Sequence, residues 1–269
     1  MDDFHRTTLG RTGLPVCRLG VACSYGAPAE AFEEAFDHGV NYFYFGGRRT
    51  GAMAQAVQNI LSRGDRDHLI ILIQSYSRSA SLMELFFRRA LQQLGIDGAD
   101  ILLLGWYNRP PPRRIIERAE RMREKGMFRY LAVSGHNRPL FPLMARNLNL
   151  DILHVRYNAA HRGAEKDIFP ELDPRDRPGI VSYTATRWGD LLNPRRMPEH
   201  QAPLTATDCY RFVLSNPSVD VCMTGPKTRG HMREALEALE LGPLSSEEMA
   251  RVRLIGDHVH ATSRRLSFG

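Results

Sequence analysis

Lysine is nearly absent from this chain of 269 residues. Of its 36 basic residues only Lys125, Lys166 and Lys227 are lysines, and arginine supplies the rest. We attribute this excess to an arginine-favouring codon usage. The net charge is +6, and the basic residues are scattered, at most in pairs such as Arg48 and Arg49, with no basic stripe interleaved with aromatic residues. This pattern argues against nucleic acid as the main partner.

The chain also lacks long apolar runs and has few cysteines. No segment reaches the about 18 apolar residues that a membrane span requires, while 43% hydrophobic and 25% charged residues are typical of a globular protein. Its four cysteines, Cys17, Cys23, Cys209 and Cys222, stand far apart without metal-ligand spacing. We expect reduced core cysteines and no metal site. A secretory signal begins with basic residues followed by an apolar run, whereas this N-terminus is acidic and polar. We therefore expect a cytoplasmic protein.

Short apolar runs with β-forming residues recur eight times, and segments with helical periodicity lie between them. The predicted strands are Arg18–Cys23, Asn41–Phe45, Leu69–Gln74, Asp100–Gly105, Tyr130–Gly135, Asp151–Tyr157, Ile180–Thr184 and Val219–Thr224. The clearest predicted helices are Ala29–His38, Ser81–Leu94, Arg114–Glu124, Thr205–Leu214 and His231–Leu239. Eight such units without a break in composition predict an α/β protein, a single (β/α)8 TIM barrel over residues 1–269.

Two irregular segments complete this prediction. Residues 7–16 contain two short β-prone pieces around a glycine-containing turn, which predicts an N-terminal β-hairpin closing the barrel floor. Residues 186–203 form the longest irregular stretch and follow the seventh strand. Because active sites of such barrels lie at the carboxyl ends of the strands, we expect this loop to face the substrate.

Several segments match a known family in order and spacing. They are Leu9–Val16, Gly39–Phe43, Leu102–Leu104, Arg129–Ser134 and Gly225–Thr228. Through them the chain resembles the aldo-keto reductases over roughly residues 6–256. The resemblance implies a (β/α)8 barrel that reduces carbonyl compounds with NADPH.

The family's catalytic residues are replaced in this sequence. The resemblance implies an Asp and a Tyr after the second strand, a Lys ending the third and a His ending the fourth. Tyr44, Arg49, Gln74 and Gly105 stand at these positions. No lysine precedes Lys125, so no local shift of the alignment restores the missing ammonium group. A phenol without that neighbour titrates near 10, so the standard proton transfer is not expected.

The cofactor positions are better preserved. Those that match or replace the family's NADP(H) contacts are Ser134, His154, Tyr183, Lys227, Thr228 and Glu234. Lys227 and Thr228 precede a predicted helix, whose N-terminal amides favour phosphate. Tyr183 stands where the family stacks an aromatic ring on nicotinamide, and His154 replaces a glutamine. We therefore expect NADP(H) as the cofactor.

Polar side chains at the predicted strand ends are candidates for substrate contact and catalysis. We expect a rebuilt catalytic centre of Tyr44, Arg49, Gln74 and His136. His136 is included because imidazole titrates near neutral pH. The predicted substrate-binding residues are Arg48, Tyr76, Asn108, Arg156 and Arg187. Arginine suits carboxylates, phosphates and developing oxyanions.

Three functions remain open at this point. The first is an NADP(H)-linked oxidoreductase with a rebuilt centre. The second is a non-redox enzyme, such as a lyase, isomerase or cyclase, that uses the arginine-lined mouth for an anionic small molecule. The third is a catalytically silent binding or regulatory protein. In each case we expect a small-molecule ligand rather than a membrane or nucleic acid, and the oligomeric state is open.

Overall fold

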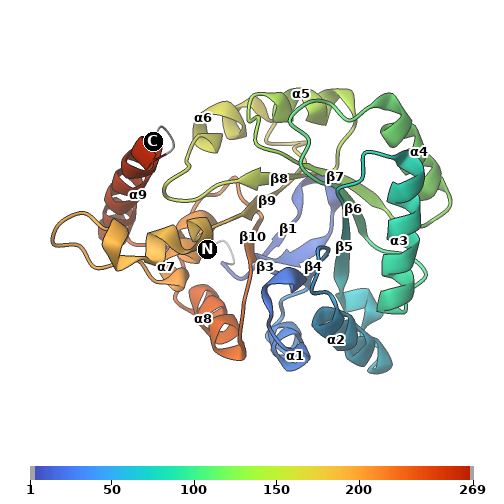
Figure 1. The fold of residues 1–269 in the computed structure, drawn as a ribbon, viewed down its shortest axis with the longest axis horizontal. Coiled ribbons are helices and arrows are strands. Elements are labelled where there is room, and N and C mark those ends of the chain that lie inside the picture. The colour runs from blue at the N-terminus through green and yellow to red at the C-terminus, as the bar shows by residue number, and fades with distance from the viewer. Residues whose placement is uncertain (1–3, 267–269) are drawn as a thin grey trace.

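Eight parallel strands close into a barrel in the computed structural model, which describes residues 4–266 and the side chains of residues 4–262 (Figure 1). They are β3 (Leu19–Ala22), β4 (Tyr42–Phe45), β5 (Ile70–Ser75), β6 (Ile101–Leu104), β7 (Tyr130–Ser134), β8 (Ile152–Arg156), β9 (Gly179–Tyr183) and β10 (Val221–Thr224). Their order around the barrel follows the chain, and β10 closes the ring by pairing with β3. The predicted fold is confirmed, and the predicted strand ends differ from the observed ones by at most two residues.

Helices surround the ring of strands. The α-helices are α1 (Ala29–Asp37), α2 (Gly51–Ser62), α3 (Ala80–Leu94), α4 (Arg113–Glu124), α5 (Leu140–Asn147), α6 (Ala164–Asp167), α7 (Ala206–Leu214), α8 (Arg229–Glu240) and α9 (Ser246–Leu266). The 3-10 helices are η1 (Gly10–Thr12), η2 (Cys23–Tyr25), η3 (Arg66–His68), η4 (Phe169–Glu171), η5 (Arg187–Leu192) and η6 (Pro194–Arg196). Helix α9 lies outside the eight strand–helix units and packs on α7 and η5 (Figure 1). No helix within residues 4–266 has both the length and the apolar character to cross a bilayer.

An N-terminal hairpin covers the floor of the barrel, as predicted. Strands β1 (Arg6–Thr8) and β2 (Pro15–Cys17) pair antiparallel. Leu9, Leu14 and Val16 join the apolar cluster inside the barrel. The backbone N–H of Arg11 donates to the carbonyl of Arg177 just before β9, at 3.0 Å. The hairpin therefore seals the end opposite the strand termini that carry polar residues.

Three aspartates fix the lower ends of alternate strands. Asp100, Asp151 and Asp220 directly precede β6, β8 and β10. The carboxylate of each accepts the backbone N–H of a residue in the preceding strand, at 2.8 Å in every case. Each also pairs with an arginine. Because these charges are used at the floor, they are not available to the site at the opposite end.

The barrel interior changes from apolar to polar along the strands. Leu72, Ile101 and Ile152 fill the lower part. Above them the Tyr42 hydroxyl and His154 Nε2 lie 2.9 Å apart, and both side chains are buried. This pair marks the boundary between the core and the open end of the barrel. All four cysteines are buried, as predicted for core residues.

Candidate functional site

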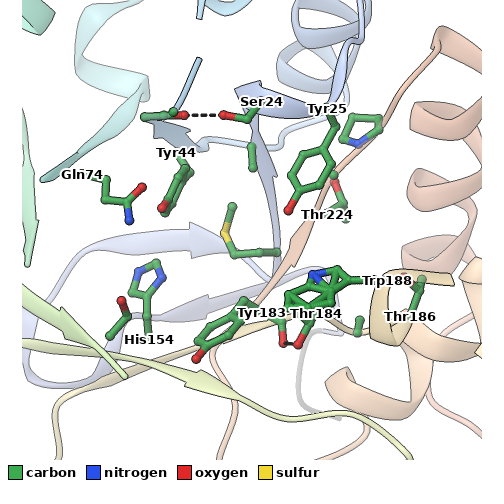
Figure 2. Close-up of a pocket in the computed structure, with 18 of the residues that line it drawn as sticks. Ser24, Tyr25, Tyr44, Gln74, His154, Tyr183, Thr184, Thr186, Trp188 and Thr224 are labelled. Atoms are coloured by element: carbon green, nitrogen blue, oxygen red, sulfur yellow. Dashed lines mark hydrogen bonds between the residues drawn. The ribbon is translucent and has the colours of Figure 1, made fainter. Parts of the chain in front are cut away.

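A cavity of about 910 Å³ opens at the carboxyl ends of the strands (Figure 2). Residues from all eight strands and from the segments after β3, β4, β5, β6, β7, β9 and β10 line it, and α7 and α8 complete one side. Figure 2 shows Tyr44, Gln74 and His154 grouped at one end, and Tyr25 with Thr224 at the other. The cavity therefore extends from the barrel centre towards the first turn of α8.

The shape of the cavity floor depends on two glycines, Gly46 and Gly105, which have no side chain. A Cβ atom built on Gly105 would lie 2.6 Å from Gln74 Nε2 and 2.7 Å from the Tyr76 ring. A Cβ on Gly46 would lie 2.9 Å from the Cβ of Gln74. The side chain of Gln74 thus packs between two glycines. Gly46, Gln74, Tyr76 and Gly105 form one compatible packing arrangement.

The tyrosines of the cavity are not tuned for proton release. Burial, reinforced by the neighbouring Tyr76 and a hydrogen bond with it, raises the pKa of Tyr44 well above its ordinary value. Burial also raises the pKa of Tyr25, again with a contribution from Tyr76. Both phenols stay protonated at neutral pH. They can donate hydrogen bonds, but they lack the acidity that an adjacent ammonium would provide.

His154 contributes a neutral imidazole. Burial lowers the pKa of His154 to about 3, so the ring is uncharged at neutral pH. Its Nε2 contacts the Tyr42 hydroxyl, and its ring centroid lies 6.1 Å from that of Tyr44. When Tyr42 donates this hydrogen bond, Nδ1 carries the imidazole proton. His154 then offers a hydrogen-bond donor without bringing a charge to the floor.

His136 and Tyr183 form a second polar pair. The Tyr183 hydroxyl donates to the carbonyl of Gly135 at 2.7 Å and lies 3.2 Å from His136 Nδ1. Burial, assisted by the positive charge of Arg156, lowers the pKa of His136 from its ordinary value of 6.5. His136 is therefore neutral at pH 7. A Cβ on Gly135 would lie 2.3 Å from the Tyr107 carbonyl oxygen, so the backbone here leaves no room for a side chain.

The cavity carries an excess of positive charge. Arg48, Arg49 and Lys227 line it, and none of them makes an ion pair with another side chain in the described part of the protein. Glu234 is the carboxylate among the lining residues, and its Oε1 accepts the backbone N–H of Ala206 at 3.2 Å. The site therefore favours an anionic ligand.

The end near α8 has the features of a phosphate site. Thr228 caps the helix, because its Oγ1 accepts the backbone N–H of His231 at 3.1 Å. Lys227 lines the cavity just before the cap, whereas Arg229 pairs with Glu34 on α1. Thr224, on the same wall, is buried, and its hydroxyl has no hydrogen-bond partner within residues 4–266. Such a group is normally satisfied by a ligand or an ordered water.

Most of the predicted site residues come together in this cavity. Those that line it are Tyr44, Arg48, Arg49, Gln74, Tyr76, Ser134, His136, His154, Tyr183, Lys227 and Glu234. Four predicted residues are not among the lining residues: Asn108, Arg156, Arg187 and Thr228.

These four residues make supporting contacts, and Thr228 is the N-cap of α8. Asn108 Oδ1 accepts the backbone N–H of His136 at 2.6 Å and so holds the loop after β7. Arg187 donates to the carbonyl of Val259 at 2.8 Å. Arg156 is half-buried and acts on His136 through its charge. Asn108, Arg156 and Arg187 do not line the cavity, and their direct contact with substrate stays a prediction.

Two tryptophans that were not among the predicted site residues also line the cavity. Trp106 follows Gly105, and Trp188 lies in the 186–203 loop that was expected to face the substrate. Both have positive φ, 59° and 55°. The positive φ of each tryptophan depends on tertiary contacts, so the sequence does not reveal it. The one signal in the sequence was that Trp188 lies in the loop expected to face the substrate.

Comparisons with known proteins identify the fold. No family model and no curated protein sequence matches the chain. The structure is similar to the aldo-keto reductase AKR11C1 from Bacillus halodurans in its holo form, with a TM-score of 0.77, 20% identity, and coverage of 93% of this chain and 95% of that one. The apo form of that protein matches with a TM-score of 0.75, 18% identity and the same coverage. The chain thus has the aldo-keto reductase fold.

Proposed function

We propose that this protein binds NADP(H) and is an atypical oxidoreductase whose centre polarises a carbonyl group with neutral hydrogen-bond donors. One observation carries the proposal: a continuous cavity joins a capped helix N-terminus with an unpaired lysine to a polar floor at the strand ends. The similarity to aldo-keto reductases in fold agrees with it.

The residues present fit such a cofactor. At one end, Lys227 and the first amides of α8 would hold the phosphate groups, and the unpartnered Thr224 hydroxyl supplies a further polar contact. At the other end, the Tyr183 ring and the Ser134 hydroxyl would contact the nicotinamide. The cavity volume of about 910 Å³ is within the range of cofactor sites.

Bound NADPH would supply a hydride to the carbonyl carbon of a substrate. The amide of Gln74 and the hydroxyl of Tyr44 would hold the carbonyl oxygen and stabilise the negative charge that develops on it. The resulting alkoxide is a stronger base than a phenolate, so Tyr44 can give it a proton despite its raised pKa. Tyr76 is 57% exposed and hydrogen-bonded to Tyr44, and it returns that proton from solvent.

This centre has a kinetic signature. The pKa of His136 lies below its usual value, and those of Tyr44 and Tyr25 lie above theirs. None of these groups titrates between about pH 7 and pH 9, so we expect kcat/KM to be flat in that interval. A sigmoidal change within it would contradict a neutral donor centre.

A second candidate function rests on the arginines. Arg48 and Arg49 carry unpaired charges beside the floor of the cavity, and Arg49 occupies the position of the family's catalytic tyrosine. They would also suit a non-redox enzyme acting on an anionic small molecule. That function needs no dinucleotide, so cofactor binding separates the two.

The test is calorimetric titration of the purified protein with NADPH and NADH. We expect NADPH to bind more tightly, and the Lys227→Ala variant to lose about 10- to 100-fold in affinity for it, because a charge-assisted phosphate contact is removed. Lys125→Ala is the matched control, since Lys125 is exposed at the end of α4 and does not line the cavity. Absence of NADPH binding at millimolar concentration would overturn the proposal and leave the second function.

A further inference from the structure

An arginine without a partner lies at the end of β8. Arg156 is the last residue of this strand, and its side chain is half-buried. Its guanidinium makes no hydrogen bond and no ion pair with the part of the chain that the structure describes. A partly desolvated charge without a counter-charge costs free energy, so packing does not account for it. An anionic ligand would supply the missing partner.

The side chain of Tyr183 separates Arg156 from the cavity. The two residues are opposite one another in the paired strands β8 and β9. From β9, Tyr183 reaches the loop after β7, where its hydroxyl donates to the Gly135 carbonyl at 2.7 Å. Its ring therefore crosses the end of β8, and it lines the cavity whereas Arg156 does not. A ligand on Arg156 would lie outside the proposed cofactor and substrate site.

A second arginine reaches this region from the side of α9. His161 follows Arg156 in the loop after β8, and its ring centroid lies 5.5 Å from that of His260 on α9. The residue before His260 is Val259, whose carbonyl accepts Nη1 of Arg187 at 2.8 Å. Arg187 therefore lies near His161, although it belongs to the loop after β9.

A third arginine comes from the loop after β7. The guanidinium of Arg138 lies over Gly163, because a Cβ built on that glycine would be 2.4 Å from Arg138 Cζ. Gly163 is two residues beyond His161 in the same loop. Burial, together with the positive charges of Arg156, Arg187 and Arg138, lowers the pKa of His161 to about 3. These three residues, from three adjacent strands, form what we call the arginine cluster.

Carboxylates offset the charge of this cluster only in part. Asp167 pairs with Arg138 at 2.8 Å. Asp190 lies 3.6 Å from Arg187 and 3.0 Å from Arg196, so two arginines share one carboxylate. With Arg156 the group holds four arginines and two aspartates, which leaves an excess of two positive charges.

His161 adds a second polar group without a partner. Its Nδ1 is buried and makes no hydrogen bond with residues 4–266. Such a group is normally satisfied by a ligand or an ordered water. Because the ring is neutral at pH 7, Nδ1 can carry the imidazole proton and donate it in a hydrogen bond. The cluster and His161 thus offer hydrogen-bond donors, as an oxyanion requires.

We propose that the arginine cluster is a second anion site, outside the cavity, which binds a phosphate dianion, either free or as a phosphomonoester. Two excess positive charges match a dianion. Guanidinium groups from three directions can hold the oxygens of a tetrahedral anion, whereas a planar carboxylate presents only two oxygens. The site does not depend on the proposed cofactor, whose phosphates would lie at the start of α8.

The test is calorimetric titration of the full chain with sodium phosphate, methyl phosphate and acetate at constant ionic strength. We expect phosphate to bind to the Lys227→Ala variant, in which the phosphate end of the cavity is disabled. In that background Arg156→Ala should weaken phosphate binding at least about 10-fold, and Arg156→Lys should recover part of the loss. Arg121→Ala is the matched control, because Arg121 is exposed on α4.

The ionisation of His136 gives an independent readout. After burial, the positive charge of Arg156 contributes to the lowered pKa of His136. A dianion on Arg156 offsets that charge, so the pKa of His136 should be higher in phosphate than in acetate. NMR titration of the histidine Cε1–H signals measures it, and His136→Gln assigns the resonance. An arginine with a purely structural role would give no such difference between the two anions.

Three results would overturn the inference. They are phosphate binding that survives Arg156→Ala, phosphate binding that is lost in Lys227→Ala, and equal affinity for acetate and phosphate. Thermal unfolding in phosphate-free buffer checks that the variant folds. Because Arg156 has no partner, we expect Arg156→Ala to unfold at the same temperature as the unmodified protein or above it, and a fall of several degrees would identify a structural arginine instead. Binding of methyl phosphate assigns the site to a phosphomonoester, and binding of phosphate alone assigns it to the free ion.

Discussion

Substituting Gly135 by alanine tests how tightly the two loops beside Tyr183 are packed. A Cβ at this position would lie 2.3 Å from the Tyr107 carbonyl oxygen, a backbone atom that cannot rotate away. The same two loops are joined by the Tyr107 N–H, which donates to the Ser134 carbonyl at 2.7 Å. Side-chain carbons essentially never approach within 3.0 Å, so the loops must separate by about 0.7 Å.

The expected cost follows from this displacement. Overpacking of a well-packed site destabilises by about 1–3 kcal/mol. For a chain of this size that corresponds to a fall in Tm of about 3–10 °C. The Gly135 carbonyl also accepts the hydroxyl of Tyr183, so the aromatic ring at the end of β9 shifts with the loop. We expect the affinity for NADPH to fall as well.

Thermal unfolding followed by circular dichroism measures the effect. Gly51→Ala is the matched control: Gly51 begins α2, its added Cβ would meet nothing within 4 Å, and alanine favours the helix by up to about 1 kcal/mol. We expect this control to be neutral or stabilising. If Gly135→Ala unfolded at the temperature of the unmodified protein, the argument that Gly135 has no room for a side chain would be refuted.

Three further outcomes are expected from the described contacts. Thr205→Ala removes the capping box that Thr205 and Asp208 form at the start of α7, and the free energy of unfolding in urea should fall by about 1 kcal/mol. Asp220→Ala leaves the guanidinium of Arg177 without its bidentate partner, and the same measurement should show a loss of about 3–5 kcal/mol. The pKa of His154 is about 3 in the native state, so the imidazole stays neutral there, whereas in the unfolded chain it takes up a proton below about pH 6.5. The native state therefore loses stability as the pH falls from about 6.5 towards 3. His154→Gln should reduce the slope of unfolding free energy against pH by about 1.4 kcal/mol per unit between pH 6 and pH 4, and an unchanged slope would contradict the assigned neutral state.

The fold was predictable because each strand carries its own local signal. Runs such as residues 70–73 and Ile101–Leu104 are apolar on both faces, as buried parallel strands require. Polar residues such as Asp100 and Asp220 mark where strands begin. The helix α9 was not predicted, because it lies beyond the eight strand–helix units of the barrel.

The candidate site was predictable where the barrel itself fixes a residue. Tyr44, Gln74 and His154 lie at strand ends, so their place on the floor follows from register. Loop residues depend on tertiary contacts that no local pattern encodes. For Asn108 the sequence did not reveal that its side chain accepts a backbone hydrogen bond from His136 and so holds the loop after β7. Trp106 depends for its backbone conformation on contacts that neighbouring residues in sequence do not reveal.

The residues on the floor of the cavity form one packing unit. Gln74 fills space that exists only because residues 46 and 105 are glycines, and Tyr76 fills the rest of the space above Gly105. Tyr44 in turn hydrogen-bonds to Tyr76. A side chain placed at position 105 alone would approach Gln74 Nε2 and the Tyr76 ring within 2.7 Å, so both of these side chains would have to move. The positions of Tyr44, Gln74 and Tyr76 therefore depend on one another, and a substitution at one of them is expected to move the others.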